Sequence, residues 1–184
     1  MDKIMEFVKT KIEGLMIIKP RIFEDDRGKF VKTFHLDTLK EQGLAGDFKE
    51  GYYSKSQKDV LRGMHFQTPT HEHEKLVYVP KGAILDVVLD IRKDSPTYGT
   101  CVSQQLDEHN GYIFYIPKGC AHGFLSLEDN TNVTYMQTSM YAPNNDGGIN
   151  PQSLGFNWGT DDLIISDRDL TFPDLEDFTT PFVG

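Results

Sequence analysis

The chain has 184 residues, of which 38% are hydrophobic and 26% charged, enough for one domain with a proper core. Its formal net charge of −9 disfavours nucleic acid or an anionic membrane as a partner, and no apolar run reaches membrane-spanning length. No signal peptide opens the chain, and Cys101 and Cys120 are its only cysteines, so we expect a cytoplasmic protein without a disulfide scaffold.

Short apolar runs separated by glycine and proline recur along the chain, which is typical of an all-β protein. The pattern predicts strands at 7–12, 15–18, 30–34, 48–55, 60–66, 75–79, 83–91, 98–106, 112–116, 123–126 and 133–141. One helix is predicted at 36–42, and the tail at 151–184 predicts loops and short helical turns over the surface. Strands in this number, in a single domain over 1–184, must close into a barrel or pack as two sheets to hide their edges.

One stretch of the sequence favours a particular fold among these. Residues 111–124, GYIFYIPKGCAHGF, have the form glycine, five residues, Pro-x-Gly, two residues, histidine. This form resembles the second motif of the cupin superfamily, a double-stranded jelly-roll barrel. The turn at 117–119 would reverse the chain and deliver His122 to the barrel interior. We therefore expect a cupin-type jelly roll with short peripheral helices.

Residues 60–66, VLRGMHF, place Arg62 and His65 three residues apart in a short run with strand character, and Lys75 opens the next such run. A base and two cations on neighbouring strands predict a site for a charged ligand whose proton is moved. Because the whole chain is acidic, the cations that bind an anionic ligand must be concentrated in one pocket. Our candidates are Arg27, Arg62, Lys75 and Arg168.

With these segments in view, the chain resembles the dTDP-4-dehydrorhamnose 3,5-epimerase family, which acts on nucleotide-linked 4-keto-6-deoxy sugars in deoxysugar and polysaccharide biosynthesis. The resemblance covers residues 7–173 and leaves residues 1–5 as a preceding extension. Seven segments carry it in the family's order: FEDDRGKF (23–30), VLRGMHFQ (60–67), EKLVYVPKG (74–82), DVVLDIRKDSPTYG (86–99), IPKGCAHGF (116–124), TYMQTSMYAP (134–143) and IISDRD (164–169).

The chemistry of such an epimerase needs a base on one face of the sugar and an acid on the other. A ketone at C4 acidifies the hydrogens at C3 and C5, histidine with a pKa of about 6.5 can be a neutral base, and tyrosine at about 10 can donate. A cation near the ketone oxygen stabilises the enolate, and no metal or redox cofactor is required. The resemblance implies His65 as base, Asp169 as its partner, Tyr135 as acid and Lys75 as enolate stabiliser.

The resemblance also implies a set of substrate-binding residues. Tyr141 follows Tyr135 by six residues, an even spacing that would put both on one face of a strand. From the residues alone, both tyrosines could equally be core aromatics, and Arg27 could simply pair with an aspartate in a turn. The predicted substrate-binding residues are Arg27, Phe30, Lys32, Glu50, Tyr52, Arg62, His122, Tyr141 and Arg168. Family members are homodimers that exchange strands, and residues 7–12 are our candidate for that exchange.

Three segments depart from the family pattern. The family's Gln-Asp-Asn before the RG-x-H motif is replaced by Glu50, Gly51 and Tyr52, and the family's glutamate beyond the RG-x-F aromatic is replaced by Lys32. The stretch at 147–158 lacks the family's first tryptophan. A changed specificity set beside an intact catalytic set predicts a different nucleotide or a different 4-keto sugar.

Other functions remain open from the sequence. One is an epimerase acting at a single carbon, or a sugar ketoisomerase. A second is a metal-dependent cupin oxygenase, since His71 and His73 form the His-x-His signature that His122 could complete. The glutamate that this signature also expects is missing, so we interpret 70–75 as a solvent-exposed loop. A third is a non-catalytic sugar-binding cupin.

Overall fold

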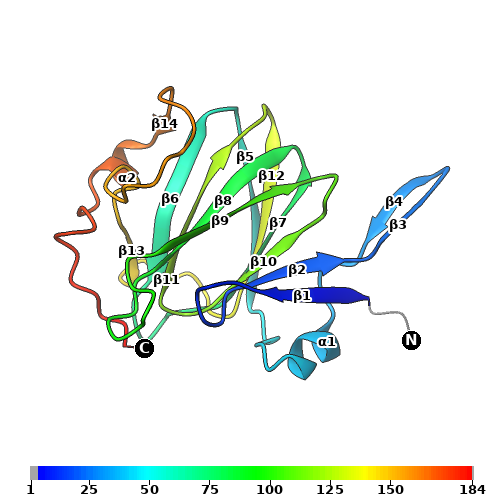
Figure 1. The fold of residues 1–184 in the computed structure, drawn as a ribbon, viewed down its shortest axis with the longest axis horizontal. Coiled ribbons are helices and arrows are strands. Elements are labelled where there is room, and N and C mark those ends of the chain that lie inside the picture. Colours follow the sequence, from blue (N-terminus) through cyan, green and yellow to red (C-terminus); the bar gives the residue numbers. More distant parts are fainter. Residues whose placement is uncertain (1–3, 184) are drawn as a thin grey trace.

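The protein, described here as a computed structural model over residues 4–183, is built mainly from two antiparallel sheets (Figure 1). The first sheet has the order β1 (Met5–Lys9), β2 (Met16–Pro20), β10 (Ile113–Ile116), β7 (Lys75–Lys81), β12 (Thr131–Gln137), β5 (Glu50–Ser56). The second has the order β13 (Asp146–Gly148), β6 (Val60–Gln67), β11 (Cys120–Ser126), β8 (Ala83–Asp90), β9 (Cys101–Asp107), and β14 (Ile164–Ile165) pairs with β6 in parallel.

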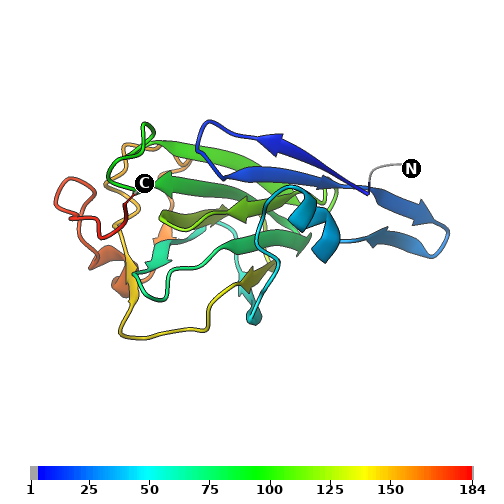
Figure 2. The same ribbon diagram turned by 90° about the horizontal axis from the view of Figure 1, so that it is seen from below.

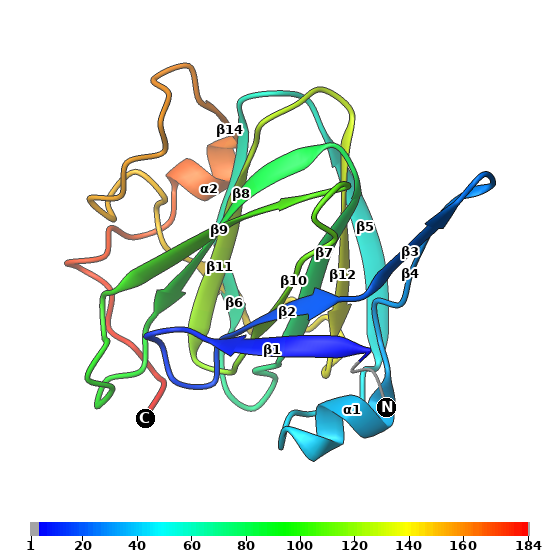
Figure 3. The same cartoon turned by 45° about the vertical axis from the view of Figure 1, so that its right-hand side comes forward.

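The path of the chain between the sheets is that of a jelly roll. Strands β5, β7, β10 and β12 belong to the first sheet, and β6, β8, β9 and β11 belong to the second, so the chain crosses repeatedly from one sheet to the other. This is the doubled Greek-key connection of the jelly-roll architecture. The predicted all-β class and the predicted double-stranded barrel are both confirmed (Figure 3).

Apolar side chains fill the barrel and also cover the outer face of each sheet. The interior cluster draws on both sheets and includes Val77, Val79, Ile84, Val88, Phe114, Phe124 and Val133. Outside the second sheet, the tail beyond residue 151 buries Trp158 and Phe182 against Leu61 and Leu89. Because both faces of these strands are buried, β8 and β11 are mostly apolar and show no regular polar alternation.

Two short helices lie at the periphery, as expected. Helix α1 (Leu36–Glu41) begins at His35, whose side chain accepts a hydrogen bond from the Thr38 amide. It packs Leu39 over the outer face of the first sheet. Helix α2 (Asp167–Leu170) lies in the C-terminal tail and is capped by Ser166. No helix among residues 4–183 is long and apolar enough to cross a membrane.

A two-stranded hairpin projects from the barrel, and the sequence did not predict it. Strands β3 (Ile22–Asp25) and β4 (Gly28–Val31) pair with each other and, within residues 4–183, with no other strand. The hairpin extends beyond the barrel at the end of the molecule opposite the C-terminal tail (Figure 2). The strand predicted at 30–34 is therefore wrong in its bounds, because the polar run before it forms the turn of this hairpin.

Other strand ends also differ from the prediction. β1 ends at Lys9 and pairs with β2 of the same chain, whereas the prediction continued to residue 12. β12 ends at Gln137, four residues before the predicted end. β13 and β14 were missed because three-residue and two-residue strands carry no readable period. Of the N-terminal extension at 1–5, residues 1–3 lie outside the described residues.

Candidate active site

A cavity of about 370 Å³ opens between the two sheets where the interior changes from apolar to polar. Its walls come from β5, β7 and β12 of the first sheet and from β6 and β11 of the second, with the loop after β12 at its rim. The lining side chains are Glu50, Tyr52, Ser54, Arg62, His65, Phe66, Gln67, His73, Lys75, His122, Phe124, Tyr135, Gln137, Tyr141, Asp146 and Arg168.

An irregularity in β6 brings Arg62 and His65 to the same wall. Residues three apart on a regular strand point to opposite faces. Here the pairing of β6 with β11 shifts register between His65 and Arg62, and Gly63 within that interval has φ +123°. A Cβ at Gly63 would lie 2.5 Å from the Gly123 Cα. Glycine at 63 therefore permits the bulge that lets both side chains line the cavity.

His65 forms a hydrogen-bonded pair with Asp169. His65 Nε2 lies 2.7 Å from Asp169 Oδ1, and the Gly63 amide donates to Asp169 Oδ2 at 3.2 Å. Helix α2 carries Asp169 to this position, where it is buried. Burial alone would raise the pKa of Asp169, but the hydrogen bonds from His65 and Gly63 outweigh it and hold that pKa below its usual range. An ionised carboxylate of this kind orients the imidazole and stabilises its charged form.

Tyr135 lies on β12, in the sheet that faces His65 across the barrel. Its hydroxyl lies 3.3 Å from Ser54 Oγ, and the ring of Tyr52 stacks on its ring with centroids 4.7 Å apart. Burial raises the pKa of Tyr135 well above its usual range. The phenol therefore keeps its proton at physiological pH and can donate it.

Lys75 is the first residue of β7 and has the same strand parity as Val77 and Val79, whose side chains fill the barrel. Its side chain is buried and lines the cavity, and no hydrogen bond to its ammonium is formed within residues 4–183. Burial lowers the pKa of Lys75 to about 8, against the attraction of Asp146 and Asp86. A buried cation without a hydrogen-bond partner in the protein is suited to bind an anionic group of a ligand.

His122 lies beside His65 on the neighbouring strand, with which it is in register. Its Nε2 lies 2.5 Å from Asp86 Oδ1, and both side chains are buried. Burial raises the pKa of Asp86 and lowers the pKa of His122, while their mutual attraction opposes both changes. As predicted from the cupin-like motif, the turn before β11 delivers His122 to the barrel interior.

The loop after β12 forms one rim of the cavity and presents Tyr141 there. The prediction that Tyr141 shares a strand with Tyr135 is wrong, because β12 ends at Gln137. The side chain of Tyr141 nevertheless lines the cavity. The Tyr141 amide donates to Glu50 Oε2 at 2.6 Å. Arg168 donates to Asp146 Oδ2 at 2.5 Å on the same rim. Glu50 thus binds the protein's own backbone.

Three predicted binding residues lie outside the cavity of this chain. Arg27 is at the turn of the β3–β4 hairpin, where it pairs with Asp25. Phe30 is on β4 and is 61% exposed, and Lys32 follows β4. In contrast, Arg62 lines the cavity and donates to Ser56 Oγ at 3.0 Å. The fold therefore brings the catalytic candidates together, but not the residues of the hairpin.

Sequence reasoning missed several polar residues of the cavity. Ser54 and Gln137 lie two residues from Tyr52 and Tyr135 on their strands, so strand alternation could have indicated them. Gln67, two residues after His65, donates to the Met140 carbonyl at 3.2 Å and accepts from the Ala142 amide at 2.7 Å. It thereby fixes the loop that carries Tyr141. Asp86 could not be predicted as a residue of the site, because nothing in the sequence indicates its hydrogen bond with His122.

The interpretation of 70–75 as a solvent-exposed loop was wrong for His73. His73 is 8% exposed and lines the cavity, its Nδ1 lies 3.1 Å from Ser139 Oγ, and burial lowers its pKa to about 3. His71 does not line the cavity. Within the described part of the chain, no three His, Cys, Asp or Glu side chains are grouped as a metal site requires, so the His71, His73 and His122 set is not formed.

A jelly-roll barrel with a histidine–carboxylate pair on one wall, a buried tyrosine on the other and a buried lysine between the sheets defines an enzyme of acid–base chemistry with the cupin fold. Comparison with known proteins gives the family. The chain belongs to the dTDP-4-dehydrorhamnose 3,5-epimerase family, whose profile matches residues 9–177. It is therefore a member of a family of isomerases.

Individual relatives agree over nearly the whole chain. A dTDP-4-dehydrorhamnose 3,5-epimerase of Methanothermobacter thermautotrophicus is 41% identical, over 93% of this chain and 95% of its own. The dTDP-6-deoxy-D-glucose-3,5-epimerase of Legionella pneumophila, solved in complex with dTDP-4-keto-L-rhamnose, superposes with a TM-score of 0.91 at 35% identity, covering 95% of each chain. ChmJ, a 3′-monoepimerase of Streptomyces bikiniensis, superposes with a TM-score of 0.87 at 31% identity, over 91% of this chain and 86% of its own.

Proposed function

We propose that this chain inverts C5 and C3 of a dTDP-linked 4-keto-6-deoxy sugar through an enolate. One observation carries the proposal: a paired imidazole and a buried phenol face each other from opposite sheets of one cavity. A sugar ring lying between the sheets would present one face to His65 and the other to Tyr135. Inversion of a carbon requires this arrangement of base and acid.

The steps follow from the positions of the groups. His65, oriented by Asp169, removes the proton from C5, and the electron pair moves into the C4 carbonyl to form an enolate. Lys75 stabilises the enolate oxygen, and Tyr135 returns a proton to the opposite face of C5. After the groups are reset, the same steps at C3 complete the reaction. Asp169 stays ionised throughout, as its lowered pKa indicates.

The diphosphate would lie among the cations of the cavity. Arg62 and Arg168 line it from β6 and α2, and His122 lies deeper. A guanidinium matches two phosphate oxygens, so Arg62 and Arg168 are suited to this contact. Tyr141 and Tyr52 at the rim are positioned for the nucleotide and sugar, and Glu50 acts through the Tyr141 loop, which it holds.

We further propose a homodimer in the cytoplasm, where the two free thiols would persist. The projecting hairpin supports the dimer, because Phe23 and Phe30 are 49% and 61% exposed on it. If Arg27, Phe30 and Lys32 bind substrate, they do so in the cavity of a second copy, since none reaches the cavity of its own chain. The edge strand β1 pairs with β2 of its own chain and leaves its other edge open for such a contact.

The product of the reaction tests the proposal. The protein is incubated with dTDP-4-dehydro-6-deoxyglucose, the ketone is trapped by borohydride, and the released sugars are identified by NMR. We expect products inverted at both C3 and C5. A sugar with its original configuration, from protein that binds dTDP, would contradict the assignment for this substrate, and GDP- and CDP-linked 4-keto sugars would then be compared.

A single inversion is the second candidate. Tyr52 occupies the cavity beside Tyr135 where the family pattern has the smaller asparagine, and the fold is shared by a 3′-monoepimerase. A ring that narrows the space beside the acid could restrict which carbon reaches it. Products inverted at one carbon only would favour this candidate over the double inversion.

A further inference from the structure

The hydroxyl of Tyr135 makes one hydrogen bond within residues 4–183, and its partner is Ser54. The two residues lie on the paired strands β5 and β12, where Tyr135 is opposite Tyr52 and Val133 is opposite Ser54. Tyr135 is 7% exposed, and Tyr52 stacks on its ring. Its hydroxyl is therefore largely screened from bulk water, and within residues 4–183 Ser54 is the side chain positioned to return a proton that it loses.

The direction of this hydrogen bond follows from the proposed reaction. A phenol has one proton, and a Tyr135 that donates this proton to a carbon of the sugar cannot also donate it to Ser54. For the phenolic proton to point into the cavity, Ser54 must donate to the Tyr135 oxygen. The same donor would stabilise the phenolate that forms when Tyr135 gives up its proton.

We propose, on the basis of the function assigned above, that Ser54 is the positioning residue and proton relay of Tyr135. It aims the phenolic proton at the sugar and reprotonates the phenolate after each inversion. Nothing in the sequence pattern singled out this residue, and its role rests on its contact with Tyr135 and on its place in the cavity wall.

The proton balance of the relay closes without another reactant. When Tyr135 protonates the carbon, its oxygen becomes a phenolate; the Ser54 hydroxyl gives its proton to that oxygen and takes one from cavity water. The hydroxide left behind is neutralised by the proton that His65 removed and then released. Ser54 is only half-buried and lines the cavity, so water can reach it.

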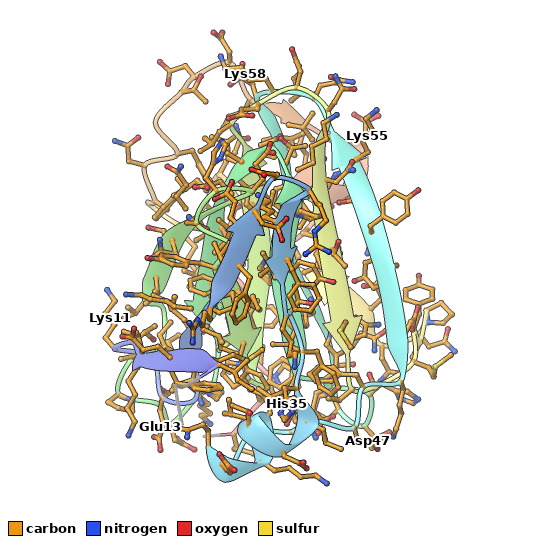
Figure 4. All side chains as sticks on the ribbon, turned by 90° about the vertical axis from the view of Figure 1, so that its right-hand side faces the viewer. Lys11, Glu13, His35, Asp47, Lys55 and Lys58 are labelled. Atoms are coloured by element: carbon orange, nitrogen blue, oxygen red, sulfur yellow. The ribbon has the colours of Figure 1, made fainter. Side chains whose placement is uncertain are left out.

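The surroundings of Ser54 support this role. β5 is the last strand of its sheet, so one side of it has no partner strand within residues 4–183, and Figure 4 shows this strand, which carries Lys55, at the margin of the barrel. Arg62 donates to Ser56 Oγ, two residues along the same strand, and its positive charge favours the phenolate. The structure thus provides both access to water and a nearby cation where the phenolate forms.

Ser54→Ala removes the relay without disturbing the base. In heavy water with dTDP-4-dehydro-6-deoxyglucose, NMR gives two rates: exchange of the C5 hydrogen, which needs His65, and inversion at C5, which needs Tyr135. We expect Ser54→Ala to slow inversion about tenfold to a hundredfold, up to the lower end of what general acid catalysis contributes because Tyr135 itself remains, with exchange changed by about twofold or less. Ser54→Thr, which keeps the hydroxyl, should restore inversion.

Two controls separate the relay from a structural effect. Binding of dTDP by calorimetry and the melting temperature show whether Ser54→Ala is folded, and Ser103→Ala on the exposed side of β9 shows the effect of losing an unrelated serine hydroxyl. If exchange and inversion fall together in a folded Ser54→Ala protein, or if neither falls, the relay is wrong. If the wild-type protein exchanges no hydrogen of any 4-keto sugar, the proposed function itself is wrong.

Discussion

At the scale of single residues, Lys75 is both buried and cationic, two properties that rarely occur together. Burial lowers the pKa of Lys75 from its ordinary value of 10.5 to about 8, so the folded protein holds this proton less tightly than the unfolded chain does. Below pH 8, Lys75 is protonated in both the folded and the unfolded protein. The buried charge then lowers the free energy of unfolding by its full amount, about 3 kcal/mol. As pH rises from about 8 to about 10.5, Lys75 loses its charge in the folded protein and this loss of stability disappears.

Lys75→Met should therefore make the protein more stable and less active. At pH 7 we expect the free energy of unfolding to rise by about 2 kcal/mol, and the gain to vanish near pH 10.5. Loss of the enolate stabiliser should lower kcat by about a hundredfold or more. Urea unfolding at several pH values and steady-state kinetics measure both effects, and a variant that is less stable at pH 7 would contradict this account of Lys75.

The pH dependence of the reaction offers a separate test. Because the free protein loses the Lys75 proton near pH 8, kcat/KM should fall above that pH. Lys75→Arg keeps its charge at all accessible pH values, so its residual activity should show this fall only at higher pH. An alkaline fall at the same pH in both proteins would assign it to another group.

The sequence predicted the catalytic candidates because each lies in a family segment: His65, Lys75, Tyr135 and Asp169 all lie at one cavity or directly behind it. It could not predict their supporting contacts, since Ser54, Asp86 and Gln67 act through partners far away in the chain. It predicted Glu50 as a substrate-binding residue but not that its carboxylate also accepts a hydrogen bond from the Tyr141 amide. Long-range pairings of this kind carry no local signal.

At the scale of elements, the bulge in β6 decides where the base lies. Gly63→Ala would force a left-handed φ on alanine and place its Cβ 2.5 Å from the Gly123 Cα and 2.8 Å from the His122 carbonyl oxygen. We expect a loss of more than about 3 kcal/mol in the free energy of unfolding, because backbone strain and a backbone clash add. Any protein that folds should have lost most of its activity.

Gly28→Ala is the matched control. Gly28 has a similar φ of +116°, but a Cβ there meets nothing within 4 Å. Gly28→Ala should lower the free energy of unfolding only through backbone strain, by about 1–2 kcal/mol. Chemical denaturation of both variants gives the comparison. If they lose equal stability, the close packing of β6 on β11 does not explain why residue 63 is glycine.

Strands buried on both faces, such as β7, β8 and β11, were predicted because apolar residues dominate them. The hairpin β3–β4 was missed because its strands are largely exposed and polar. β13 and β14 are too short to show a period, and they exist only because β6 offers its edge to them.

At the scale of the whole molecule, the fold places the catalytic candidates in one chain and leaves part of the predicted binding set on a hairpin that reaches away from it. We expect sedimentation to show a dimer. Phe30→Asp should shift it toward monomer and weaken dTDP binding, because Phe30 pairs with Phe23 in the exposed apolar part of the hairpin.

Val183→Asp is the matched control for that experiment. Val183 is 75% exposed near the C-terminus, at the opposite end of the molecule from the hairpin (Figure 2). It should leave both the sedimentation and the binding unchanged. Wild-type protein that sediments as a monomer at its working concentration, or a Phe30→Asp protein that remains a dimer, would exclude the hairpin as the contact.

The sequence predicted the jelly roll, because its segments keep the family's order over nearly the whole chain. The arrangement of sheets then explains why one barrel can serve inversion: β6 and β12 belong to opposite sheets, so a base on β6 and an acid on β12 face each other across the space where the sugar lies. Two of the changed residues, Glu50 and Tyr52, line this cavity, and Tyr52 stacks there on Tyr135.

The account depends most on His65 as the base, and solvent deuterium exchange tests it directly. Wild-type protein and His65→Asn are incubated with dTDP-4-dehydro-6-deoxyglucose in heavy water. His35→Asn serves as the control, since His35 caps α1 away from the cavity and asparagine is also a good cap (Figure 4). We predict deuterium at C5 and C3 with the wild type and with His35→Asn, and none with His65→Asn. Exchange that persists in a folded His65→Asn protein would contradict the account.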